Sequence, residues 1–177
     1  MALTSAAGLV SLLDDKGTDV KAFALKRLNE LVDQFWAEIS ESVNKIEILH
    51  EDSTFPHNKL AALLASKVYY HLAEYEDALH FALCAEELFD TNASSEFVET
   101  IISKCIDKYT ELRVAQDLAA DGLTGTLSRQ DSTGDRTWAA NSATYKRLEL
   151  VVDKMFDRCF EHKQYKQALG IAIETRR

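Results

Sequence analysis

The sequence predicts an all-α fold, a right-handed superhelical stack of antiparallel helix pairs in one continuous domain over residues 1–177. The chain holds one proline and six glycines, so it has few residues that interrupt a helix. Apolar residues recur at three- and four-residue steps along most of the chain, the pattern of a helix with one buried face. A motif near Tyr75 returns near Tyr165, which is typical of repeated helix pairs.

Composition and charge argue against several classes of protein. Hydrophobic residues make up 46% and charged residues 28%, as in ordinary globular proteins. The net charge is −9, whereas a nucleic-acid surface needs clustered Lys and Arg, so we expect no nucleic-acid partner. No apolar run reaches the roughly 20 residues of a membrane helix. The N-terminus has no basic leader and meets Asp14 and Asp15, so we expect neither a signal peptide nor a membrane partner.

The first half of the chain predicts four helices. The first runs over residues 4–13, and Thr18 caps the second. That second helix breaks near Ser40 and resumes over residues 42–52, and Pro56 marks the next boundary. Its buried face is predicted from residues three or four apart: Ala24, Leu28, Leu31, Phe35 and Ile39. The next helix carries a four-residue stripe: Leu60, Leu64, Val68 and Leu72.

Two further helices follow a short break at Ala73-Glu74. The partner helix carries Ala78, Ala82, Ala85 and Phe89 on one side. Ser94 or Ser95 caps the next, whose predicted face is Val98, Ile102, Cys105, Tyr109 and Leu112. Short connections make such helices antiparallel neighbours.

Residues 115–143 interrupt the helical pattern. The segment holds three of the six glycines and many small polar residues, so we predict a flexible surface insertion, cut first in limited proteolysis. Ser132, three residues after Arg129, is a candidate phosphorylation site, and Trp138 either docks on the helices or contacts a partner. The helical pattern resumes with Leu148, Val151, Val152, Met155 and Cys159, and again from Tyr165.

The repeat aligns residues 70–82 with residues 160–172 without a gap. The shared positions predict a helix–turn–helix joint, with an aromatic wedge at the turn and small residues where two helices come close. In the first copy they are Tyr70, Tyr75, Ala78, Leu79 and Ala82, and in the second Phe160, Tyr165, Ala168, Leu169 and Ala172. The pattern resembles tetratricopeptide-type repeats, although the Trp-Leu-Gly segment and the closing proline of that consensus are missing.

Four residues around the predicted turn carry acid–base side chains. His71, Glu74, Asp77 and His80 form a conceivable acid–base set, but the second copy of the repeat keeps neither histidine, so we interpret them as solvated turn residues. No phosphate-binding loop, dinucleotide fingerprint or nucleophile elbow occurs, so we expect no enzyme, no cofactor and no small-molecule substrate. We place Trp36 in the core rather than at a partner contact.

The three cysteines fit none of the usual patterns of cysteine chemistry. Cys84, Cys105 and Cys159 form no CxxC pair and no Cys/His pair at metal-ligand spacing. Each lies in a helical apolar pattern, so we expect small core side chains, no metal, no disulfide framework and a reducing compartment.

Four stretches resemble one family. LTSAAGLVSLLDD, FWAEISESVNKIEILHED, SSEFVETIISKCIDKYTE and YKQALGIAIETRR are similar to the start of the larger non-ATPase scaffold subunit of the proteasome regulatory particle base. The resemblance fails over residues 115–143. It implies a fragment of the family's N-terminal rod of stacked helix pairs, which ends within a helix whose apolar face still needs a neighbour.

The resemblance also implies a function. Family members are non-catalytic, so this segment is expected to be a scaffold that positions neighbouring lid and base subunits for ATP-dependent degradation of ubiquitinated proteins, in the cytoplasm and nucleus. The alternative is a generic tetratricopeptide-like adaptor that captures short peptides in a groove lined by Asn, Lys or Arg. The sequence shows no such repeated line of residues.

Overall fold

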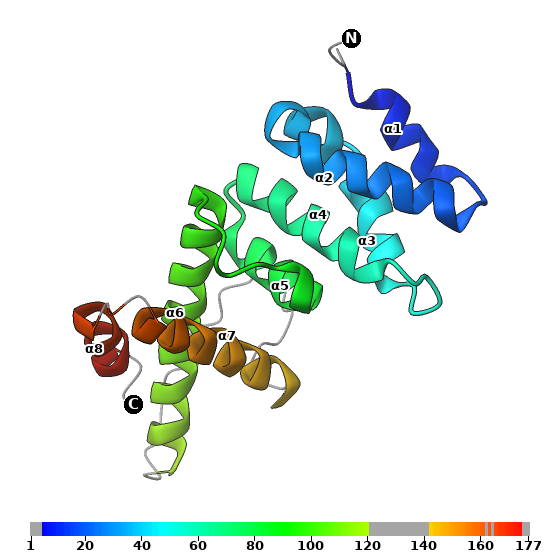
Figure 1. The fold of residues 1–177 in the computed structure, drawn as a ribbon. Coiled ribbons are helices and arrows are strands. Elements are labelled where there is room, and N and C mark those ends of the chain that lie inside the picture. The colour runs from blue at the N-terminus through cyan, green and yellow to red at the C-terminus, as the bar shows by residue number, and fades with distance from the viewer. Residues whose placement is uncertain (1–4, 121–141, 162, 164, 175–177) are drawn as a thin grey trace. The chain divides into compact units, whose positions relative to one another are not determined.

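The computed structural model describes residues 5–120, 142–161, 163 and 165–174. Every regular element in these ranges is a helix, which confirms the predicted all-α class (Figure 1). The chain divides into two compact units, residues 1–101 (unit 1) and 102–177 (unit 2). The boundary falls inside helix α6, Glu96–Ala120.

Unit 1 is organised around one central helix. Its elements are α1 (Ala7–Ser11), η1 (Leu12–Asp14), α2 (Thr18–Ser40), α3 (Val43–Glu51), α4 (Asn58–His71), α5 (Tyr75–Ala85) and η2 (Glu86–Leu88). Helix α4 packs against α2, α3 and α5 (Figure 1). The small side chains Ala61, Ala62 and Ala65, all fully buried, let these neighbours approach α4 closely.

Helices α2 and α4 run in the same direction. The amide of Asn29 donates from Nδ2 to the carbonyl of Leu60 at 3.3 Å, and four residues later Asp33 Oδ1 lies 3.2 Å from Nε2 of His71. Both helices therefore advance together from one contact to the next. This is the relation expected of the first helices of two successive pairs.

Helix α3 runs opposite to α4. The Tyr69 hydroxyl donates to Glu47 Oε1 at 2.8 Å near the end of α4, whereas His50 Nδ1 lies 3.3 Å from the Asn58 carbonyl at its start. The predicted break after Ser40 is confirmed, because α2 ends there and α3 begins at Val43.

Three predictions for the first helices are wrong. Thr18 is the first helical residue rather than the cap, because Gly17 holds the N-cap position without a side-chain bond. Leu72 is 38% exposed, since a four-residue step turns a helix by about 400° and the stripe drifts off the core face. Trp36 is not in the core but 37% exposed, and Phe35 before it has non-helical torsions (φ −120°, ψ 19°) that kink α2.

Of the two serines proposed to cap α6, Ser95 is the one with a capping bond. Its Oγ accepts from the Val98 N–H at 3.3 Å, one residue before the helix starts. Val98 itself is buried, so the predicted apolar face of α6 belongs to the core at this point.

Unit 2 contains the rest of α6, α7 (Ser142–Glu161) and α8 (Tyr165–Glu174). Tyr109 of α6 is fully buried, and its ring stacks on Tyr145 of α7 with centroids 5.3 Å apart. Cys105 Sγ lies 3.8 Å from the Leu148 carbonyl. The remaining core comes from positions the pattern predicted, namely Val152, Met155, Cys159 and Ala168, together with Ile171.

The predicted insertion over residues 115–143 is helical at both ends. Helix α6 continues to Ala120 and α7 begins at Ser142. Ser132 and Trp138 fall outside the described residues, so the phosphorylation and docking hypotheses stay predictions.

Candidate functional site

The first helix joint is built on a left-handed residue. Ala73 has φ 62°, its N–H bonds to the Tyr70 carbonyl at 3.0 Å, and the N–H of Glu74 bonds to the Tyr69 carbonyl at 3.0 Å. These two bonds are the Schellman motif that ends a helix and reverses the chain. The turn satisfies carbonyls left open at the end of α4 and delivers Tyr75 as the first residue of α5.

Replacing Ala73 by glycine should stabilise the protein. A left-handed backbone costs an L-residue with a Cβ roughly 1–2 kcal/mol, and glycine adopts it freely but loses more chain entropy on folding. We expect Ala73→Gly to raise the free energy of unfolding by about 1 kcal/mol in urea titrations. The matched control, Ala37→Gly at an exposed position within α2, should lower it by about 1 kcal/mol. Equal losses in the two variants would contradict the left-handed turn.

The first joint is closed by buried apolar residues of α5. Ala78, Leu79 and Ala82 are each at most 1% exposed. The hydroxyl of Ser66, itself fully buried, donates to the Ala78 carbonyl at 2.7 Å. This bond crosses between α4 and α5, and it needs the close approach that an alanine permits.

The second joint has the same backbone turn. Lys163 has φ 56°, and its N–H bonds to the Phe160 carbonyl at 3.1 Å, the counterpart of the Ala73–Tyr70 bond 90 residues earlier. The wedge pairs also match, because the Tyr70–Tyr75 and Phe160–Tyr165 ring centroids are both 6.3 Å apart.

The two joints differ in how far they are covered. In the second copy Ala168 is buried and Ala172 is half-buried, but Leu169 is 61% exposed, as are Phe160 (56%) and Tyr165 (59%). Leu79, the counterpart of Leu169, is buried. Within the described residues, the second joint is therefore buried on the side of Ala168 but not on the side of Leu169. The first joint is buried on both corresponding sides, at Ala78 and at Leu79.

The histidines of the first joint have structural partners. His71, with a side chain 22% exposed, pairs with Asp33 and stacks on Trp36 at 5.8 Å between ring centroids. His80 lies edge-on to Phe81 and 3.9 Å from the sulfur of Cys84. The interpretation of His71 as a solvated turn residue is wrong, because α2 covers its ring. Neither set of contacts assembles the four residues into one acid–base site.

A chain of aromatic rings that the sequence reading missed crosses this joint. Trp36 of α2 stacks on His71, His71 lies edge-on to Tyr70, and Tyr70 contacts both Tyr75 of α5 and Phe97 of α6. These five residues are here called the aromatic strip. Neighbouring ring centroids lie 5.3–6.3 Å apart. Burial raises the pKa of the Tyr70 phenol, and the carboxylate of Glu96 adds to that rise. The cluster of aromatic residues at positions 69–75 was the feature of the sequence that could have predicted this strip.

Cys105 should be unreactive in the folded protein. Burial raises the pKa of its thiol to about 12, so the reactive thiolate is a fraction of about 10⁻⁴ at pH ~8. We expect Ellman's reagent to label half-buried Cys84 first and Cys105 only on unfolding. In denaturant all three thiols should react, and this gives the total with which labelling of the native protein is compared. Labelling of Cys105 as fast as Cys84 under native conditions would refute its burial.

Within residues 5–120, 142–161, 163 and 165–174, no three His, Cys, Asp or Glu side chains gather as a metal site would require. No helix in the same ranges has the length and apolar content to cross a bilayer. The features that remain are the packed joints and their exposed aromatic edges, which suit contact with another protein.

Comparison with known proteins gives consistent results along the whole chain. The family described as "26S proteasome subunit RPN2, N-terminal domain" matches residues 4–177. The chain is 51% identical over 177 residues to the "26S proteasome non-ATPase regulatory subunit 1" of Drosophila melanogaster, covering 100% of this chain and 16% of that protein. It is 40% identical over 174 residues to the "26S proteasome regulatory subunit RPN2" of Saccharomyces cerevisiae, covering 98% and 17%.

The chain thus spans about a sixth of the length of these relatives. The match reaches across both units and across residues 115–143, where the resemblance read from the sequence had failed. The chain belongs to the family of the N-terminal domain of the 26S proteasome subunit RPN2.

Proposed function

We propose that this segment is a non-catalytic scaffold of the proteasome regulatory particle. It positions neighbouring lid and base subunits for ATP-dependent degradation of ubiquitinated proteins, in the cytoplasm and nucleus. The family match over residues 4–177 carries the proposal, because relatives with 40–51% identity are named as regulatory subunits.

The architecture of unit 1 supports the same role. Helices that alternate in direction around α4 form a core of their own, so an exposed face is ordered before any partner arrives. A preordered surface loses little conformational entropy on binding, which favours stable assembly. None of the three cysteines, which all lie in the described residues, forms a disulfide, and this is compatible with a reducing compartment.

Removal of the segment from the full-length subunit tests the proposal. We expect a subunit lacking residues 1–177 to recover fewer lid and base subunits on affinity purification, and the resulting particles to degrade a ubiquitinated substrate more slowly. Full-length subunit with the stabilising Ala73→Gly change is the matched control and should assemble normally. Unaltered composition and unaltered degradation after the deletion would refute the scaffold role.

A further inference from the structure

The two units carry very different charge. Residues 1–101 hold 18 Asp and Glu against 7 Lys and Arg, a net charge of −11, whereas residues 102–177 carry +2. The asymmetry is steepest around the first joint. Residues 68–103 include eight Asp and Glu and no Lys or Arg. The aromatic strip lies largely in this stretch, so the sequence segment that carries it contributes formal charge of one sign only.

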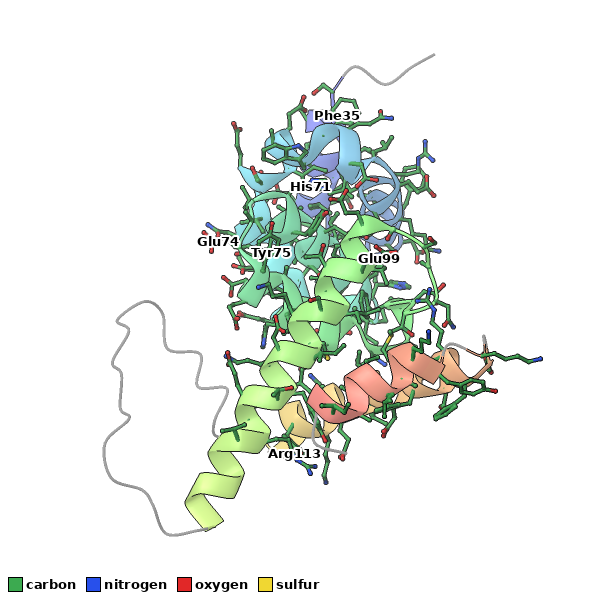
Figure 2. The ribbon with its side chains drawn as sticks, turned by 90° about the vertical axis from the view of Figure 1, so that its left-hand side faces the viewer. Phe35, His71, Glu74, Tyr75, Glu99 and Arg113 are labelled. Atoms are coloured by element: carbon green, nitrogen blue, oxygen red, sulfur yellow. The ribbon has the colours of Figure 1, made fainter. Side chains whose placement is uncertain are left out.

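Three carboxylates lie along the aromatic strip and are here called the acidic rim. Asp33, 85% exposed, contacts His71; Glu74 directly precedes Tyr75; and Glu96 acts on the Tyr70 phenol. Figure 2 shows His71 and Tyr75 following one another along one side of unit 1, with Glu74 beside Tyr75 and Phe35, the neighbour of Trp36, beyond His71.

One basic side chain, Lys67, acts electrostatically on Asp33 of the rim, but it is turned inward. Lys67 is half-buried, and its ammonium donates to the Asn29 carbonyl at 3.1 Å. Burial lowers the pKa of Lys67, as expected for an ammonium group turned in between α2 and α4. It therefore serves the packing of these helices, while Trp36 (37% exposed) and Tyr75 (36%) show their ring surfaces to solvent.

We propose that the aromatic strip and its acidic rim form a docking site for an arginine-bearing basic segment of a neighbouring regulatory-particle subunit. A guanidinium group stacks on aromatic faces and pairs with carboxylates, and both groups lie side by side here. Arginine fits better than lysine because its planar group does both at once. The inference rests on the proposed scaffold function and names the chemistry of one partner contact.

The test measures binding of short overlapping peptides that tile the other regulatory-particle subunits. The 177-residue chain with Trp138→Phe is used, so that Trp36 is the fluorophore that reports binding. We expect the bound peptides to contain arginine. Changing that arginine to glutamine should weaken binding by about tenfold, and changing it to lysine by less. Affinity should fall as salt rises above about 0.15 M.

Two pairs of variants separate the strip from general effects. Tyr75→Leu should weaken binding by about tenfold, whereas Phe23→Leu, at an exposed ring near the start of α2, should not. Glu74→Gln with Glu96→Gln should weaken it by about threefold. The charge-matched control is Glu51→Gln with Glu87→Gln. These residues directly follow His50 and Glu86, which contact Asn58 and Lys59 at the start of α4, about 18 Å along the helix from His71. The control should leave peptide binding unchanged.

Three results would overturn the inference. The first is that no peptide binds, and the second is that binding withstands Tyr75→Leu and the rim variant with melting temperatures unchanged. The third is self-association of the chain that Tyr75→Leu abolishes, because the occupant would then be a second copy. If one of these results is obtained but deletion of residues 1–177 still disrupts assembly, the docking site is rejected and the scaffold proposal is retained.

Discussion

Ala78→Trp should strongly destabilise the helix pair at the centre of unit 1. Ala78 is fully buried, and its carbonyl accepts the Ser66 hydroxyl at 2.7 Å, so an indole has no space between α4 and α5. We expect a loss of about 3 kcal/mol or more from overpacking, which lowers the melting temperature of a unit of this size by about 12–24 °C. Thermal denaturation followed by circular dichroism measures it.

The control is Ala37→Trp, which places the same side chain on an exposed position of α2 and should change the melting temperature little. Ala168→Trp repeats the experiment in the second joint, where the change should be smaller because the neighbouring Leu169 is already 61% exposed. A melting temperature that Ala78→Trp leaves unchanged would contradict the close packing of α4 on α5.

Tyr109→Ala should destabilise unit 2 by about 3–5 kcal/mol. Tyr109 has the largest side chain among those that are fully buried in the described residues, and its ring stacks on Tyr145. Truncation removes that contact and leaves a cavity between α6 and α7. Urea denaturation together with hydrogen exchange of the α7 amides should show the loss in unit 2.

Tyr109→Phe isolates the hydroxyl from the ring. Arg113 donates to the Tyr109 oxygen at 3.3 Å, and its guanidinium carbon lies 5.9 Å from the ring centroid. The Phe variant keeps the packing and should lose only about 1 kcal/mol. If both variants cost the same, the loss would come from the hydroxyl rather than from the ring packed between α6 and α7.

The elements of the fold could be predicted where periodicity and turn chemistry agreed. Helix α5 begins directly after the predicted break at Ala73-Glu74, and α6 begins after Ser95, because helix ends are determined by local bonds that the sequence displays. The start of α2 was misplaced by one residue, because glycine and threonine both suit an N-cap.

The surroundings of Trp36 could not be predicted. Its exposure depends on the kink at Phe35, which no proline or glycine announces, and on His71, which is 35 residues away in the sequence. The left-handed turns were hidden for a related reason, since alanine and lysine occupy positions where glycine would be the usual signal. Long-range stacking and the choice between near-equal backbone states leave little trace in local patterns.

The candidate site could likewise be predicted only in part. Alignment of the two repeats selected Ala78, Leu79 and Ala82, which are buried, and Ala168, which is buried in the second joint. It could not show that Leu169 is exposed, because coverage depends on the next layer of helices rather than on the repeat itself. The aromatic strip was missed because its rings come from α2, α4, α5 and α6.

The absence of Lys and Arg from residues 68–103 has a practical consequence for mapping contacts. Cross-linkers that react with amines have no target on this stretch, and trypsin has no cleavage site within it, so one long peptide carries α5 and the first joint. Carbodiimide coupling uses carboxylates instead, and Glu74 and Glu96 supply them beside the aromatic strip. Coupling of acids to a partner's amines, followed by cleavage at aromatic or acidic residues, is therefore the chemistry that can map this face.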